Sequence, residues 1–137
     1  MSQSKKQLVP FWVIVLQVIL TLIMLGQVYM YFFNNHLITE SGIEINGVPT
    51  LNLIYEMGAR TFVMVIASIY VLVTQNPKQF LVVLIMNIAR EAQEMVIDPL
   101  FPILNAPVSP LTDFLIHLVI VIIEIWAFVV VYKSQNK

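Results

Sequence analysis

The stretch that decides the fold is residues 8–33, which read LVPFWVIVLQVILTLIMLGQVYMYFF and contain no charged side chain. About 20 consecutive apolar residues are enough to cross the hydrocarbon core of a bilayer as a helix. The run is too long for the apolar region of a signal peptide, and no cleavage motif of small residues follows it. It therefore predicts a retained first transmembrane helix.

Three more apolar segments follow the first, each close to the length that spans a bilayer. A short turn joins the second segment to the third, so these two are expected to be antiparallel neighbours. The sequence thus predicts an all-α fold, a four-helix transmembrane bundle that forms one domain over residues 1–137. Its predicted helices cover residues 8–33, 51–74, 78–97 and 111–132.

Capping residues and prolines indicate where these helices begin and end. Thr50 can cap the second helix, and Asn76 with Pro77 fits the N-cap and first position of the third. Pro99 is expected to stop the third helix, because proline lacks the N–H that an interior position needs. Ser109, which is followed by another proline, reads as the N-cap of the last helix.

The two longer connections differ in character. In residues 34–50, the alternation of Ile43-Glu44-Ile45 followed by Asn-Gly predicts a small β-hairpin. The segment from Pro99 to Pro110 contains four prolines among apolar residues. It is expected to lie at the membrane interface rather than to be a solvated linker, where it could cover a site as a lid.

The composition supports a lipid environment. Of the 137 residues, 59% are apolar and only 11% are charged, with a mean hydropathy of +0.87. Soluble domains carry about 25% charged residues, so lipid must be the main solvent here. The net charge of −1 argues against nucleic acid as a partner, and the absence of cysteine excludes disulfides, thiolate metal sites and thiol catalysis.

The lysines predict the orientation. Cytoplasmic connections of membrane proteins carry an excess of Lys and Arg. Neither residues 34–50 nor residues 98–110 contain a Lys or an Arg, so both are expected outside, with both termini cytoplasmic. This pattern predicts a multi-pass protein of a plasma or inner membrane, and the lysines that set it are Lys5, Lys6, Lys78, Lys133 and Lys137.

Each of the last three predicted helices carries one polar stripe at three- and four-residue spacing, which places its members on one helix face. An ionisable group in lipid is costly unless it faces the bundle interior or water. We therefore expect the stripes to converge on a polar cavity in the outer half of the bilayer. They contain Glu56 and Arg60 on the second helix, Asn87, Arg90, Glu91, Glu94 and Asp98 on the third, and Asp113, His117 and Glu124 on the fourth.

Six acids and two arginines lie in these stripes. Protonated carboxyls, a bound cation or water at the rim must offset this imbalance. Some members have simple structural interpretations, because the Glu56–Arg60 and Arg90–Glu94 spacings favour ion pairs. Asp98 is expected at the interface, and Asp113 could favour a helix N-terminus; both are rim residues.

Glu91 and His117 are harder to interpret as structural. A Glu-x-x-Glu spacing with a nearby histidine can bind a metal, but the arginines compete for these carboxylates. We therefore predict no metal and no cofactor, and expect His117 to hydrogen-bond one of the carboxylates. On the first helix, Gln27 and Tyr29 could line the cavity.

The leading hypothesis is a protein that binds a small polar or amphiphilic ligand. The paired arginines could meet an anionic headgroup and the surplus acids a cationic group. The alternatives are an accessory subunit of a larger membrane complex, an acid–base enzyme that uses Glu91 or Glu94 with His117 on a lipid-soluble substrate, and proton-coupled or cation transport. The predicted binding residues are Glu56, Arg60, Arg90, Glu91, Glu94, His117 and Glu124.

A family resemblance covers about a third of the chain. The stretch Glu56-Met57-Gly58-Ala59-Arg60, then Asn76-Pro77, then Arg90 resembles the DoxX-like superfamily of small four-helix membrane proteins. The resemblance implies a four-helix bundle, and for some members a role as accessory subunits of membrane redox systems. The placement of acids is also similar to that of the sterol-isomerase-like four-helix fold, which implies an acid–base isomerase.

Overall fold

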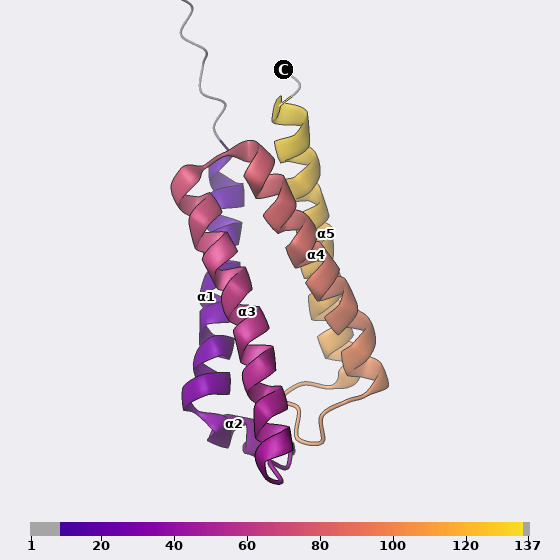
Figure 1. The fold of residues 1–137 in the computed structure, drawn as a ribbon. Coiled ribbons are helices and arrows are strands. Elements are labelled where there is room, and N and C mark those ends of the chain that lie inside the picture. The colour runs from indigo at the N-terminus through magenta and orange to yellow at the C-terminus, as the bar shows by residue number, and fades with distance from the viewer. Residues whose placement is uncertain (1–8, 136–137) are drawn as a thin grey trace, which may run out of the picture.

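The computed structural model describes residues 9–135, and within them every regular element is a helix (Figure 1). This confirms the all-α prediction. Lys5, Lys6 and Lys137, on which part of the predicted orientation depends, lie outside the described residues, as does the predicted start of the first helix at residue 8. The helices are α1 (Phe11–Phe33), α2 (Asn35–Glu40), α3 (Val48–Thr74), α4 (Pro77–Leu100) and α5 (Pro110–Gln135).

Three of these helices, α1, α3 and α5, are long and apolar enough to cross a membrane. No more than a third of the most apolar window of each is buried inside the molecule. Large apolar side chains such as Leu22, Val73 and Trp126 are therefore exposed. Such exposure is unfavourable in water but not in lipid. The chain is accordingly a small membrane protein. The fourth long helix, α4, has 24 residues and carries Arg90, Glu91, Glu94 and Asp98 of the predicted polar stripes.

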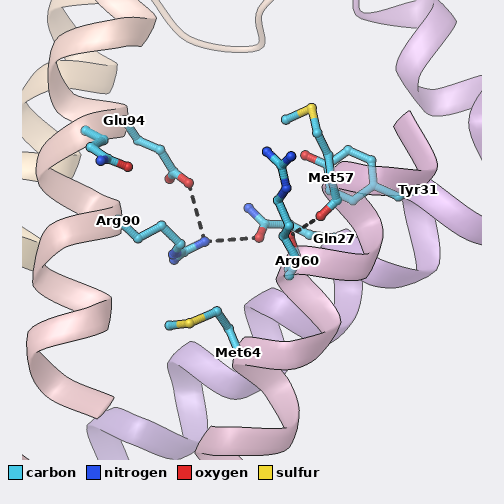
Figure 2. A pocket seen from close by; sticks show the side chains of 9 residues that line it. Gln27, Tyr31, Met57, Arg60, Met64, Arg90 and Glu94 are labelled. Carbon is cyan, nitrogen blue, oxygen red and sulfur yellow. Dashed lines mark hydrogen bonds and ion pairs between the residues drawn. The ribbon is translucent and has the colours of Figure 1, made fainter. Parts of the chain in front are cut away.

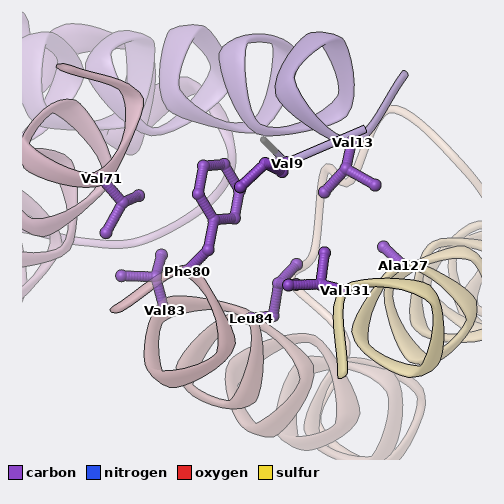
Figure 3. Close-up of a cluster of buried hydrophobic side chains, with 8 residues drawn as sticks. All are labelled: Val9, Val13, Val71, Phe80, Val83, Leu84, Ala127 and Val131. Carbon is purple, nitrogen blue, oxygen red and sulfur yellow. The ribbon is translucent and has the colours of Figure 1, made fainter. Parts of the chain in front are cut away.

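The long helices pack as two pairs, α1 with α3 and α4 with α5. The pairs meet at the end of the molecule that carries the α3–α4 turn, where an apolar cluster draws on all four helices (Figure 3). Contacts between α3 and α4 are fewer than those within each pair. Away from this end the two pairs separate, and a smaller apolar cluster of Met24, Val28 and Val65 joins only α1 and α3. The cluster contains Val9, Val13, Val71, Phe80, Val83, Leu84, Ala127 and Val131.

The predicted hairpin at residues 43–47 is wrong, because the described residues contain no strand. The connection between α1 and α3 holds the short helix α2 instead, followed by an irregular segment. Gly42 and Gly47 both have positive φ, at 93° and 82°, which breaks the extended conformation that a strand needs. Gly47 is the N-cap of α3, so Thr50 lies inside the first turn and does not cap the helix.

Pro99 does not stop α4, contrary to prediction. The helix continues through Leu100, and the N–H of Phe101 donates to the carbonyl of Ile97 at 2.8 Å. A proline in the last turn removes only one backbone hydrogen bond, which a helix tolerates better there than at its centre. Two predicted starts are confirmed: the Asn76 side chain accepts from the N–H of Lys78, and Ser109 Oγ accepts from the N–H of Thr112.

Candidate functional site

A cavity of about 330 Å³ lies between α1 and α3 on one side and α4 on the other (Figure 2). Of the residues predicted to form a binding site, Arg60, Arg90 and Glu94 line it. The other wall residues were not predicted, except Gln27. On α1 the wall also includes Tyr31, whereas Tyr29 is exposed and stacks on Phe33. The lining residues are Gln27, Tyr31, Met57, Arg60, Thr61, Met64, Arg90, Gln93 and Glu94.

Arg90 connects the two helix pairs. Its Nη1 donates to Oε1 of Gln27 on α1 at 3.2 Å and lies 3.5 Å from Oε1 of Glu94. Its Nη2 is paired with Glu91, whose side chain is only 3% exposed. Its Nε is buried and has no partner. Arg90 thus has one donor free while its charge faces two glutamates.

Arg60 has a much more open environment. Its side chain is 78% exposed, and its nearest acid is Glu56, 3.4 Å away and one turn earlier on α3. Glu56 also accepts from Asn52 at 3.2 Å and does not line the cavity. The expected i,i+4 pair therefore forms, but it leaves most of the guanidinium of Arg60 free to meet a ligand.

His117 lies in the interface between α4 and α5, surrounded by carboxylates. Its Nδ1 is 2.7 Å from Oε2 of Glu91 and 3.9 Å from Oε2 of Glu94. Its Nε2 is 3.6 Å from Asp98 and 3.8 Å from Asp113. The expected hydrogen bond from His117 to a glutamate is thus present, and the two rim acids lie on the opposite side of the ring.

Two sets of three side chains have the spacing to hold a metal ion, with ligand atoms within 4.8 Å of one another. Both sets include His117; Glu91 and Glu94 complete one, Asp98 and Asp113 the other. Arg90 already pairs with both glutamates of the first set, and the second set shares its histidine with the first. We therefore interpret the group as an ion-pair network rather than a metal centre.

A layer of uncharged polar groups lies deeper in the bundle and joins three helices. Gln17 donates to Ser68 at 3.0 Å and accepts from Asn87 at 3.1 Å, and all three side chains are buried. The partners of Gln17 cannot be predicted from the sequence, because the sequence does not give the rotation of α1 against its neighbours. Glu124 is fully buried on α5, and neither carboxylate oxygen has a partner.

The proline-rich connection does not cover the cavity. It packs on α2 at the far end of the molecule, where Asn105 donates to the carbonyls of Ser41 and Glu40, both at 3.1 Å. A separate cavity of about 140 Å³ lies beneath it, with Asp98 and Asp113 in its wall. The connection therefore covers the rim acids rather than the two arginines.

Comparison of the chain with models of known protein families, with curated proteins and with solved structures found no match. Function is therefore inferred from the geometry of the cavity and of the network beside it. That geometry brings two arginines and one glutamate into a partly apolar cavity, and it places an acid–histidine chain next to it.

Proposed function

We propose that the chain crosses the membrane four times, with α4 as the fourth span, and binds a small amphiphile with an anionic headgroup in the cavity between α1, α3 and α4. The cavity wall that carries both Arg60 and Arg90 is the observation that supports this most directly. Guanidinium groups bind carboxylates and phosphates through paired N–H donors. Arg60 is largely free, and Arg90 keeps its Nε unpaired.

The apolar part of the wall suits the tail of such a ligand. Met57 and Met64 line the cavity beside the arginines. Unbranched methionine side chains adapt to ligands of irregular shape. The cavity lies where the two helix pairs separate, so an acyl chain could enter between α3 and α4 from the lipid.

The test is binding of two single-chain amphiphiles, laurate and dodecyltrimethylammonium, to the purified protein in nanodiscs of zwitterionic lipid. We expect laurate to bind more tightly, and Arg60→Gln to weaken it about tenfold, since loss of one charge-assisted hydrogen bond costs about 1.5 kcal/mol or more. Lys133→Gln, far from the cavity, is the matched control. Equal binding of both amphiphiles, or unchanged laurate binding by Arg60→Gln, would contradict the proposal.

A second candidate is an accessory subunit of a larger membrane complex, as the DoxX-like resemblance implies. The observation that favours it is an apolar groove of about 240 Å³ between α3 and α4, lined by Ala67, Tyr70, Val71, Gln79, Val82, Val83 and Met86. Native mass spectrometry from mild detergent separates the two candidates. A bound amphiphile on the monomer favours the first, and a retained partner protein favours the second.

A further inference from the structure

Glu124 is a buried acid whose environment the proposed ligand does not explain. Its side chain is 0% exposed, it does not line the cavity, and both of its carboxylate oxygens lack a hydrogen-bond partner. Removing an unpaired carboxylate from water is too costly for a stable fold. The carboxyl group is stable there only if a proton or another small species neutralises it.

The helix geometry identifies a second group at the same level. The contact between Glu91 and His117 fixes the register of α4 against α5. Toward the α3–α4 turn, Asn87 lies one turn from Glu91, and Glu124 lies two turns from His117. Side chains lean toward the N-terminus of their own helix, so in this antiparallel pair Asn87 and Glu124 lean toward each other. Oδ1 of Asn87 is also buried without a partner, so the layer holds three unsatisfied acceptors.

These three hydrogen-bond acceptors can be satisfied only by a species that provides a hydrogen-bond donor. A proton on Glu124 makes the carboxyl neutral and turns one oxygen into a donor, and one water can satisfy the remaining acceptors. A metal cation fits less well, because Arg90, which is paired with Glu91 beside the route from the rim, would repel it. A proton avoids this obstacle, since it moves along hydrogen bonds rather than through open space.

A chain of titratable groups connects the rim to this layer. Asp98 and Asp113 lie 3.6 and 3.8 Å from Nε2 of His117, which is the separation of groups joined through one water or by a small side-chain movement. Nδ1 of His117 is in direct contact with Glu91 at 2.7 Å. The charged groups around the route are Arg90 and Glu94 on α4, while α1 and α3 contribute the uncharged Gln17 and Ser68 to the layer.

We propose that Glu124 is a proton-binding site at the centre of the bundle, loaded from the outer rim through His117 and Glu91. A proton from the rim binds Nε2 of His117, and His117 then gives its Nδ1 proton to Glu91. Glu91 passes a proton through a water molecule to Glu124. In each transfer one O–H or N–H bond breaks and one forms. No oxidant or reductant takes part. The proposal is independent of whether an amphiphile binds in the cavity.

Infrared spectroscopy of the whole protein in nanodiscs tests the site. A protonated carboxyl in an apolar environment gives a C=O band distinct from that of a carboxylate. We expect one such band in the unmodified protein, its loss in Glu124→Gln, and its retention in Glu44→Gln, which changes an exposed acid between α2 and α3. Retention of every protonated-carboxyl band in Glu124→Gln would overturn the proposal. So would sodium-dependent thermal stability that Glu124→Gln abolishes, because that result would identify a metal cation.

Deuterium exchange of the same band tests the route. On transfer into D₂O the Glu124 band shifts as its proton is replaced. His117→Gln keeps a donor for Glu91 but cannot relay a proton, so we expect exchange to slow by about a hundredfold or more, the lower end of what a positioned acid–base group contributes. His36→Gln, on exposed α2, should exchange at the unmodified rate. Equal exchange in both variants would overturn the route through His117.

Discussion

Arg60 and Arg90 carry the same charge but have opposite environments. Arg90 is only 20% exposed and faces Glu91, Glu94 and Gln27. Arg60 is 78% exposed and has one acid at 3.4 Å. Removing one member of a buried ion pair leaves an uncompensated charge, whereas removing one member of an exposed pair has little effect. We therefore expect Arg90 to stabilise the fold and Arg60 to contribute mainly to binding.

The same substitution at both positions checks this division. Arg90→Gln should lower the free energy of unfolding by about 3–5 kcal/mol, because it leaves Glu91 buried with only His117 beside it. Arg60→Gln should lower it by less than about 1 kcal/mol. Unfolding of each variant by a titration of denaturing detergent into mild detergent, followed by circular dichroism, measures both values. Similar losses at the two positions would refute the division.

The residue pattern predicted much of this region but not its division into two environments. The three- and four-residue spacing indicated that Arg90, Glu91 and Glu94 share one side of a helix. Adjacent residues in a helix are nevertheless turned by about 100° from each other, because one turn takes 3.6 residues. Arg90 therefore faces the cavity (Figure 2). Glu91 instead contacts His117 on α5. A sequence does not give the rotation of a helix about its axis, so a single shared cavity was expected.

At the scale of the helices, one glycine sets the distance between α1 and α3. A Cβ atom added to Gly58 would come within 2.9 Å of Cβ of Tyr31 and 3.0 Å of Cε2 of Phe32. An equivalent atom on Gly26 would meet nothing within 4 Å. Small residues allow such close approach of membrane helices, so the two glycines have different roles.

Gly58→Ala should therefore destabilise the protein and Gly26→Ala should not. Overpacking costs about 1–3 kcal/mol, which exceeds the gain in helix propensity at Gly58. At Gly26 that gain of about 0.5–1 kcal/mol is not opposed. Thermal unfolding of the two variants in the same detergent gives the comparison. A Gly58→Ala variant as stable as Gly26→Ala would mean that the α1–α3 distance is not set by this contact.

The existence of the long helices could be predicted from the sequence, but some of their ends could not. Asn76 and Ser109 were recognised because a cap depends only on nearby residues. Pro99 was misinterpreted because its effect depends on how much helix follows it. The alternation at residues 43–45 suggested a strand, but residues 9–135 form no strand, and a strand without a partner for its backbone hydrogen bonds is not stable.

At the scale of the whole molecule, the α1–α3 and α4–α5 connections lie against each other, with contact between Ser41 and Asn105. The α3–α4 turn lies at the opposite end (Figure 1). Lys78 and Lys133 belong to that opposite end. The pairing of α1 with α3 and of α4 with α5 could not be predicted, because every long helix is apolar over most of its surface. In contrast, the position of the connections could be predicted, because antiparallel helices place the first and third connections at one end and the second at the other.

This arrangement and the lysine pattern together predict the labelling of single cysteines, which the native chain lacks. Asn46→Cys and Asn105→Cys should react with a membrane-impermeant maleimide added to intact cells. Asn76→Cys should react only after the membrane is permeabilised. Gel-shift detection of a maleimide polymer reads out each variant. The reverse pattern would show that both termini face outward.

Trp12 on α1 and Trp126 on α5 are the two tryptophans of the chain, and their ring centroids are 5.3 Å apart. Each is next in sequence to a member of the apolar cluster, Val13 or Ala127, where the two helix pairs meet. All tryptophan fluorescence of the protein therefore comes from one place, at the junction of the pairs. Any movement of one helix pair against the other would alter the distance between the two rings and thus the fluorescence emission. The unmodified protein therefore needs no added label for such a movement to be measured.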